Sequence, residues 1–223
     1  MCRYLFPNRQ THMKYSLALL IVILITLTLT FFNNSEQRNT KPLTGLPWQI
    51  DILPNGDSRV FGITPGRTTL GEVIKLLGEE QELAIIAAPY EAGSLEAYYS
   101  RYSVGPITGK LILVLDITPD VLSSMRQRAV KDGGSRKYYL HPDDLPIAYR
   151  APVRVINYLP GFNLDEEIAQ TRFGTPAEII QTHAQQKHLL YPDKGLDFIL
   201  NEDGKEVLQY LHPDEFSAHR DQL

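Results

Sequence analysis

The chain has 223 residues, with 22 lysines and arginines, 26 aspartates and glutamates, and one cysteine. A single cysteine, Cys2, excludes an intrachain disulfide. Residues 1–40 hold four of the basic and one of the acidic side chains, so the rest of the chain has 18 against 25, a net charge of −7. This balance argues against nucleic acid or an anionic membrane surface as the main partner of that part.

Residues 15–32, YSLALLIVILITLTLTFF, form an uncharged apolar run. As a helix with about 1.5 Å per residue it would be about 27 Å long, close to the roughly 30 Å hydrocarbon core of a bilayer. Arg3, Arg9 and Lys14 precede it without any acidic residue, and positive charge stays on the cytoplasmic side. The sequence therefore predicts a cytoplasmic segment at 1–14, a single transmembrane helix at 15–32 and a periplasmic C-terminal domain.

A secretory signal peptide has the same order of charge and apolar residues, but its apolar region usually has about 7 to 15 residues and ends at a small-residue cleavage site. The run here is longer and no such site follows it. We therefore expect a retained anchor in the inner membrane. A cleaved signal, which would release a soluble exported domain, is the alternative that N-terminal sequencing decides. Residues 33–47 are polar, contain two prolines and are expected to be a linker.

Residues 48–132 are expected to form a first α+β unit. Asn55-Gly56 is typical of a tight hairpin turn between alternating strands. Thr69, with Glu72 three residues later, predicts a capping box at the start of a helix. The expected elements are strands at 48–53, 58–63, 82–88, 94–102 and 109–116 and helices at 70–77 and from Pro119 to about Lys131.

The remaining residues repeat this order. The expected segments are a connector at 133–152, a second α+β unit at 153–216 and a tail at 217–223. In the second unit, Asn163 and Glu166 predict a capping box for a helix that ends near Phe173, and strands are expected at 153–160, 188–192, 195–200 and 205–211. We interpret this order as an internal duplication, so that the predicted fold is α+β with two pseudo-repeated units, each with a helix on an antiparallel sheet.

Motifs that carry chemistry are weak. The segment Gly62–Thr69, GITPGRTT, has some likeness to a phosphate loop, but Arg67 stands where that loop needs lysine and the spacing differs. No G-x-S-x-G elbow occurs. We therefore expect no catalytic residue, cofactor or nucleotide. His183, His188 and His212 are the candidates for a dispersed metal site, although their spacing does not match a known ligand pattern and polar side chains at strand ends explain them as well.

Two groups of side chains are candidates for contacts with a partner. Tyrosines on predicted strands suit both the margin of a core and an interface. A basic cluster on the second helix suits an acidic partner or lipid headgroups, and a solvated helix face explains it equally. The interaction candidates are Tyr98, Tyr99, Tyr102, Arg126, Arg128 and Lys131.

The pattern Gly66, Thr69, Glu72-Val73 and Leu77-Gly78, followed by a sheet, resembles the helix of the small BamE/SmpA-type modules of Gram-negative envelopes. Phe173-Gly174-Thr175-Pro176 is similar to the helix exit of such modules. The resemblance implies tandem modules, although the lipid-attachment cysteine of those lipoproteins has no counterpart here. Stretches such as PWQIDILPNG and YPDKGLDFILNEDGKEVLQY also resemble a family of proteobacterial membrane-anchored proteins, and that resemblance implies no activity.

Taken together, these patterns predict a single-pass inner-membrane protein whose periplasmic domain is a protein-interaction or scaffolding module of the cell envelope. The expected partners are the lipid bilayer, through residues 15–32, and an envelope protein. The alternative is an extracytoplasmic hydrolase or metal-dependent enzyme with a dispersed histidine site. The two hypotheses differ in whether His183, His188 and His212 converge.

Overall fold

The computed structural model describes residue 26 and residues 43–182, 185–201 and 204–223. Leu43–Leu223 form one compact unit. The expected cytoplasmic segment, the expected span apart from Thr26, and most of the expected linker lie outside the described residues. Within the described part, none of the helices combines the length and the apolar character of a membrane span.

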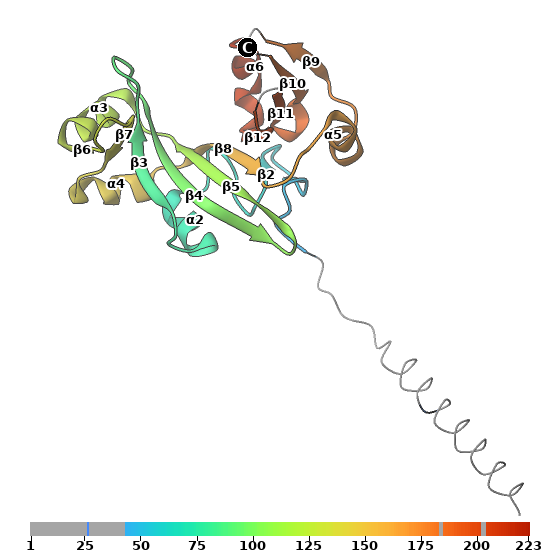
Figure 1. Ribbon diagram of the computed structural model, residues 1–223, viewed down its shortest axis with the longest axis horizontal. Coiled ribbons are helices and arrows are strands. Elements are labelled where there is room, and N and C mark those ends of the chain that lie inside the picture. The colour runs from blue at the N-terminus through green and yellow to red at the C-terminus, as the bar shows by residue number, and fades with distance from the viewer. Residues whose placement is uncertain (1–25, 27–42, 183–184, 202–203) are drawn as a thin grey trace, which may run out of the picture. The chain divides into compact units, whose positions relative to one another are not determined.

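The domain is an α+β fold built on a large antiparallel sheet (Figure 1). Its strands are β1 (Asp51–Ile52), β2 (Ser58–Arg59), β3 (Glu82–Ile86), β4 (Ser94–Val104), β5 (Ile107–Leu115), β6 (Val130–Lys131), β7 (Lys137–Tyr139), β8 (Val153–Pro160), β9 (Glu178–Gln181), β10 (Gln186–Tyr191), β11 (Leu196–Asn201) and β12 (Val207–Leu211). The main sheet has ten strands in the order β6–β7–β3–β4–β5–β8–β12–β11–β10–β9, and β1 and β2 pair separately.

Short helices connect these strands. The α-helices are α2 (Leu70–Leu77), α3 (Pro119–Arg128), α4 (Leu145–Arg150), α5 (Glu166–Phe173) and α6 (Phe216–Arg220), and single 3₁₀ turns are η1 (Pro142–Asp144), η2 (Pro192–Lys194) and η3 (Pro213–Glu215). The expected connector at 133–152 is therefore folded, since it holds β7, η1 and α4, and β7 pairs with β3 of the first half.

The helix starts follow the residues expected of them only in part. At α2, Glu72 Oε2 accepts a hydrogen bond from the Thr69 backbone N–H at 2.8 Å and the Thr69 hydroxyl accepts one from the Glu72 N–H at 3.4 Å, which confirms the capping box. At α5 the N-cap is Asp165 rather than Asn163. Helix α3 ends at Arg128, earlier than expected, because the next residues pair with β7 as β6.

The main core lies on one face of the sheet. Buried side chains alternate along β5, where Leu113 and Leu115 belong to the core, as the period of two in a strand requires. Helices α2, α3, α4 and α5 all contribute to the same cluster. Over β10 and β12 the opposite face is also covered, because Phe216 of α6 packs there with Leu190 and Leu211.

The two expected units share one sheet. Strand β8, the first of the expected second unit, pairs along its length with β5 and on its other side with β12. A row of paired residues on the core face runs through Ala97, Leu113, Ile156, Tyr210 and Leu196 on five successive strands. The hydrophobic core is therefore continuous across the junction.

Candidate functional site

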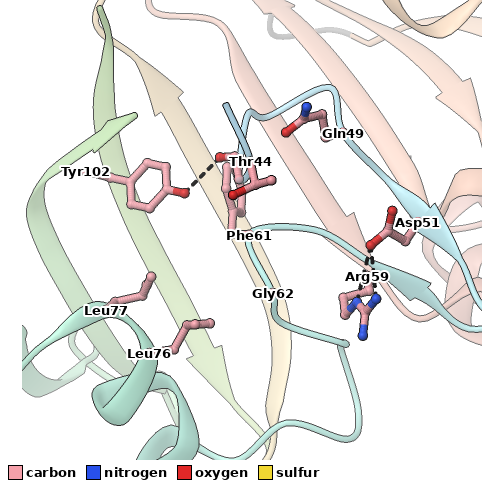
Figure 2. A pocket seen from close by; sticks show the side chains of 10 residues that line it. Thr44, Gln49, Asp51, Arg59, Phe61, Gly62, Leu76, Leu77 and Tyr102 are labelled. Atoms are coloured by element: carbon pink, nitrogen blue, oxygen red, sulfur yellow. Dashed lines mark hydrogen bonds and ion pairs between the residues drawn. The ribbon is translucent and has the colours of Figure 1, made fainter. Parts of the chain in front are cut away.

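A cavity of about 500 Å³ lies between the start of the domain, the β1–β2 hairpin, α2 and β4 (Figure 2). Its apolar wall is formed by the side chains of Phe61, Leu76, Leu77 and Tyr102. Polar groups also line it, from Thr44, Gln49, Asp51 and Arg59. An apolar wall with a few polar groups is the usual composition of a binding pocket in a protein.

A strained turn places the Phe61 ring in this wall. Val60 and Ile63 exchange backbone hydrogen bonds of 3.0 and 2.8 Å across Phe61 and Gly62, and both central residues have positive φ, 55° and 78°. Positive φ at both positions is the requirement of a type I′ turn, and a bulky residue adopts it at a cost of about 1–3 kcal/mol. The expected strand at 58–63 is thus only two residues long before this turn.

Burial of the Phe61 ring offsets this cost. The residue is 4% exposed, and its ring makes edge-on contacts with Tyr102 at 5.1 Å and with Tyr210 at 5.7 Å between ring centroids. Such aromatic pairs contribute about 0.5–1.5 kcal/mol beyond the area that they bury. The wall is therefore a fixed part of the core margin.

Several polar groups of the cavity are already paired within the domain. Arg59 and Asp51 form an ion pair with 3.1 Å between Nη2 and Oδ2. The Tyr102 hydroxyl donates a hydrogen bond to the Gly45 carbonyl at 2.8 Å, and burial raises the pKa of Tyr102 to about 12. A tyrosine with its ordinary pKa of about 10 is already protonated at neutral pH, so the Tyr102 hydroxyl remains a hydrogen-bond donor. These groups suit hydrogen bonding to a ligand better than proton transfer.

The three candidate tyrosines lie on different faces of β4. Tyr99 is 3% exposed and its hydroxyl donates to the Gly78 carbonyl at 3.2 Å, so it belongs to the core. Tyr102 lines the cavity described above. Tyr98 lies on the opposite face of the sheet, where it is half-buried beside Ile112 of β5. Only Tyr98 thus lies on the face away from the core.

The candidate basic residues make contacts within the domain. Arg126 donates hydrogen bonds to the Glu91 carbonyl and the Tyr138 hydroxyl and lies over the Tyr138 ring. Arg128 forms an ion pair with the fully buried carboxylate of Asp144. Lys131 Nζ is 5.7 Å from the centroid of the Tyr138 ring. The contacts of Arg126 and Arg128 hold α3 against β7 and η1.

His212 has both ring nitrogens committed. Its Nδ1 accepts a hydrogen bond from the Asp214 backbone N–H at 3.2 Å, which leaves the proton on Nε2 for the bond of 2.8 Å to Asp57 Oδ1. Burial raises the pKa of Asp57, but hydrogen bonds from His212, Asn55 and Arg67 outweigh it and hold that pKa below its ordinary value. The cluster therefore fixes the β1–β2 hairpin to the end of β12.

His188 belongs to a second, separate cluster. Its Nδ1 and His219 Nε2 both lie 2.8 Å from Oδ2 of Asp197, which is 0% exposed. Asp197 Oδ1 is buried with no hydrogen-bond partner among the described residues. Burial raises the pKa of Asp197, and the two histidines lower it further than that, so the net shift is downward.

The dispersed histidine site of the alternative hypothesis is not assembled in the described part of the chain. His188 and His212 contact different carboxylates, and His183 lies outside the described residues. Among the residues that the structure describes, no group of three or more histidine, cysteine or acidic side chains could hold a metal ion. Sequence patterns do not single out Asp197 as a site residue, although a charged residue inside the apolar strand GLDFIL is a signal of a buried polar contact.

Comparison with known proteins adds no family to this description. A scan against protein-family models, a search of curated proteins and a search of solved structures each returned no match to the chain.

Proposed function

We propose that the chain is a single-pass inner-membrane protein whose periplasmic α+β domain is a protein-interaction module of the cell envelope. The apolar run at 15–32 and the basic residues before it support the anchor and its orientation. A fusion of alkaline phosphatase after Leu223 should be active, because that enzyme matures only outside the cytoplasm. A fluorescent protein fused there should be fluorescent instead if the domain is cytoplasmic.

The observation that carries the interaction role is the cavity beside Phe61. Its apolar wall is fixed by core packing, its rim has an ion pair and an amide, and the Tyr102 hydroxyl is held by its hydrogen bond to the Gly45 carbonyl. A partner that inserts one apolar side chain and hydrogen-bonds to the rim fits this composition, since interface energy concentrates in such pockets. Thr44 and Gly45 also line the cavity, so the site lies where the linker joins the domain.

Leu76 offers a direct test, because its side chain lines the cavity and the residue is 53% exposed. A photo-crosslinking amino acid at position 76 of the full chain, in living cells, should give an adduct with one envelope protein. In the same cells Leu76→Glu should reduce recovery of that protein at least tenfold. Ile179→Glu, a change at a residue of β9 that is 47% exposed and does not line the cavity, should leave recovery unchanged. Equal loss in both variants would exclude the cavity as the site.

We also propose that the two halves derive from one duplicated unit, as the resemblance to tandem BamE/SmpA-type modules implies. Helices α2 and α5 are each followed by a C-cap glycine, Gly78 and Gly174, and a strand begins four residues after each glycine. The stretch Tyr-Leu-His-Pro-Asp occurs twice, and in both copies the imidazole, His141 or His212, accepts the backbone N–H two residues later. The two halves differ in the position of their last strand. In the first half β7 pairs with β3, the first strand after α2, whereas in the second half β12 pairs with β11, the third strand after α5. Failure of 70–86 to superpose on 166–182 in an experimental structure would contradict the proposal.

A further inference from the structure

A bulge in β4 interrupts the regular pairing with β5. Tyr99 pairs with Leu111 and Tyr102 pairs with Gly109, so that Ser100 and Arg101 together oppose the single residue Lys110. A bulge of this kind bends its strand and redirects side chains. It brings Arg101 next to Lys110 on the neighbouring strand.

These side chains line a cavity of about 420 Å³. Three of its lining residues are cationic, Arg101, Lys110 and Lys205. Ser100 and Thr108 supply hydroxyl groups, and Leu159 supplies apolar surface from β8. In the described residues, no acidic side chain lines this cavity.

The three cations have no ionic partner in the described part of the chain. Lys205 Nζ donates a hydrogen bond of 3.3 Å to the neutral Asn163 side chain, and neither Arg101 nor Lys110 forms an ion pair with a described carboxylate. Arginines elsewhere, such as Arg128 and Arg220, are paired. Like charges around a concave surface create a local positive potential that attracts an anion. The domain is acidic as a whole, but salt screens the interactions of exposed charges beyond about 8 Å at physiological ionic strength. The potential in the cavity therefore depends mainly on the charges that line it.

We propose that this cavity binds the phosphate group of a membrane phospholipid. Phosphate oxygens accept hydrogen bonds from cationic side chains and from hydroxyl groups. The apolar surface of Leu159 matches the glycerol and acyl part next to a lipid phosphate. The assignment of this phosphate to a membrane lipid rests on the proposed membrane anchor at residues 15–32. Leu43, the first residue of the compact unit, packs against the β4–β5 turn, since a Cβ atom added at Gly105 would lie 3.0 Å from Leu43 Cδ1.

The length of the linker is compatible with this source. Residues 33–42 separate the expected span from Leu43, and ten residues extend over at most about 36 Å. The bulge lies four residues before the Gly105 turn along β4, which is about 13 Å at the rise of a strand. The cavity is therefore within reach of the headgroups of the anchoring membrane.

Phosphate binding can be measured on the full chain in a non-ionic detergent. Equilibrium dialysis with radiolabelled glycerol 3-phosphate should detect binding to the wild-type chain, and Arg101→Gln/Lys110→Gln should weaken that binding at least tenfold. The matched control is Lys75→Gln/Arg150→Gln, which removes two exposed charges from α2 and α4 and should change the binding less than twofold. No binding to the wild-type chain at 10 mM ligand, or an equal loss in the control, would overturn the site.

A displacement arm distinguishes the source of the phosphate. Short-chain phosphatidylglycerol should displace the labelled ligand at a concentration at least tenfold lower than unlabelled glycerol 3-phosphate, because its acyl chains add apolar contact. Equal potency would overturn the lipid assignment and leave a site for a soluble phosphate ester. Neither result depends on the topology fusions, so a failure of the proposed anchor and a failure of this site can be told apart.

Discussion

Asp197 shows how one buried carboxylate organises its surroundings. His188 on β10 and His219 on α6 both direct a ring nitrogen to Oδ2, so the side chain of Asp197 on β11 links β10 to α6. A buried charge is tolerated only where such hydrogen bonds compensate for lost hydration. Two further contacts hold α6 against the sheet. Phe216 packs against Leu190 and Leu211, and Arg220 forms an ion pair with Glu178 of β9.

Replacing Asp197 by asparagine keeps the shape and removes the charge. We expect the free energy of unfolding to fall by about 3 kcal/mol, because hydrogen bonds to a buried charged group contribute about 1.5–3 kcal/mol each and both are weakened. Urea unfolding of the full chain in non-ionic detergent, followed by circular dichroism, measures the change. Asp51→Asn is the control, since that side chain is 64% exposed and its ion pair should contribute less than about 1 kcal/mol. Equal effects would show that Asp197 carries no special role.

Asp197 and Asp57 also predict how stability depends on pH. Both have a pKa below the ordinary value in the folded state, so between the two values the unfolded chain binds more protons. Their stabilising contribution is therefore complete above the unfolded pKa of about 3.9 and is lost as the pH falls through the folded values. Urea midpoints measured from pH 7 to pH 3 should fall most steeply below about pH 4. The fall should be shallower in Asp197→Asn, and an unchanged slope would contradict this assignment.

The sequence predicts few of the residues that form the candidate site, because their contacts depend on the tertiary fold. Arg67 and His212 stand out as single residues, but the hydrogen bonds that join them through Asp57 connect residues 155 positions apart. The ring of Phe61 enters the wall of its cavity only because of a type I′ turn. Sequence patterns favour glycine or asparagine at such a turn, and a phenylalanine there gives no local signal.

At the scale of elements, local sequence patterns predict some helix boundaries correctly and miss others, at starts as well as at ends. The capping box at Thr69 is confirmed because both of its partners lie within one turn. Thr118 has the residue type of an N-cap and is followed by proline, yet its side chain makes no capping hydrogen bond. Helix α3 stops at Arg128 because β6 pairs with β7, and β7 in turn pairs with β3, which lies far earlier in the chain. Tertiary pairing thus overrides local propensity at that end.

The two threonines provide a matched pair for a test of capping. Thr69→Ala should lower the free energy of unfolding by about 1 kcal/mol, because it removes the acceptor for the Glu72 N–H and a partner of the Glu72 carboxylate. Thr118→Ala should lower it by less than about 0.5 kcal/mol, because no capping bond is lost. Urea unfolding of both variants measures the difference. A larger effect at Thr118 would contradict the hydrogen bonding described for α3.

At the scale of the whole molecule, the sequence predicts the fold class and most strands but not their junction. Alternation along 109–116 and 153–160 predicts each strand separately, since the pattern within a strand depends only on which face is buried. That β5 and β8 pair with each other depends on matched apolar residues such as Leu113 and Ile156 on strands separated by α3 and α4. Periodicity contains no information about such a partner. The two expected units are therefore joined in one continuous sheet.

A continuous sheet and core predict cooperative unfolding of both halves. Ile85 in β3 and Leu208 in β12 are each 0% exposed, and either change to alanine should lower the free energy of unfolding by about 3 kcal/mol. Circular dichroism reports on the whole domain, whereas fluorescence of Trp48, the only tryptophan, reports on the side that packs against Arg172 of α5. In urea unfolding of the full chain in detergent, each variant should shift both signals to the same new midpoint. Leu76→Ala, at a residue 53% exposed, should shift them little. Two separated midpoints in Ile85→Ala, with Trp48 unaffected, would mean that the β5–β8 pairing does not couple the halves.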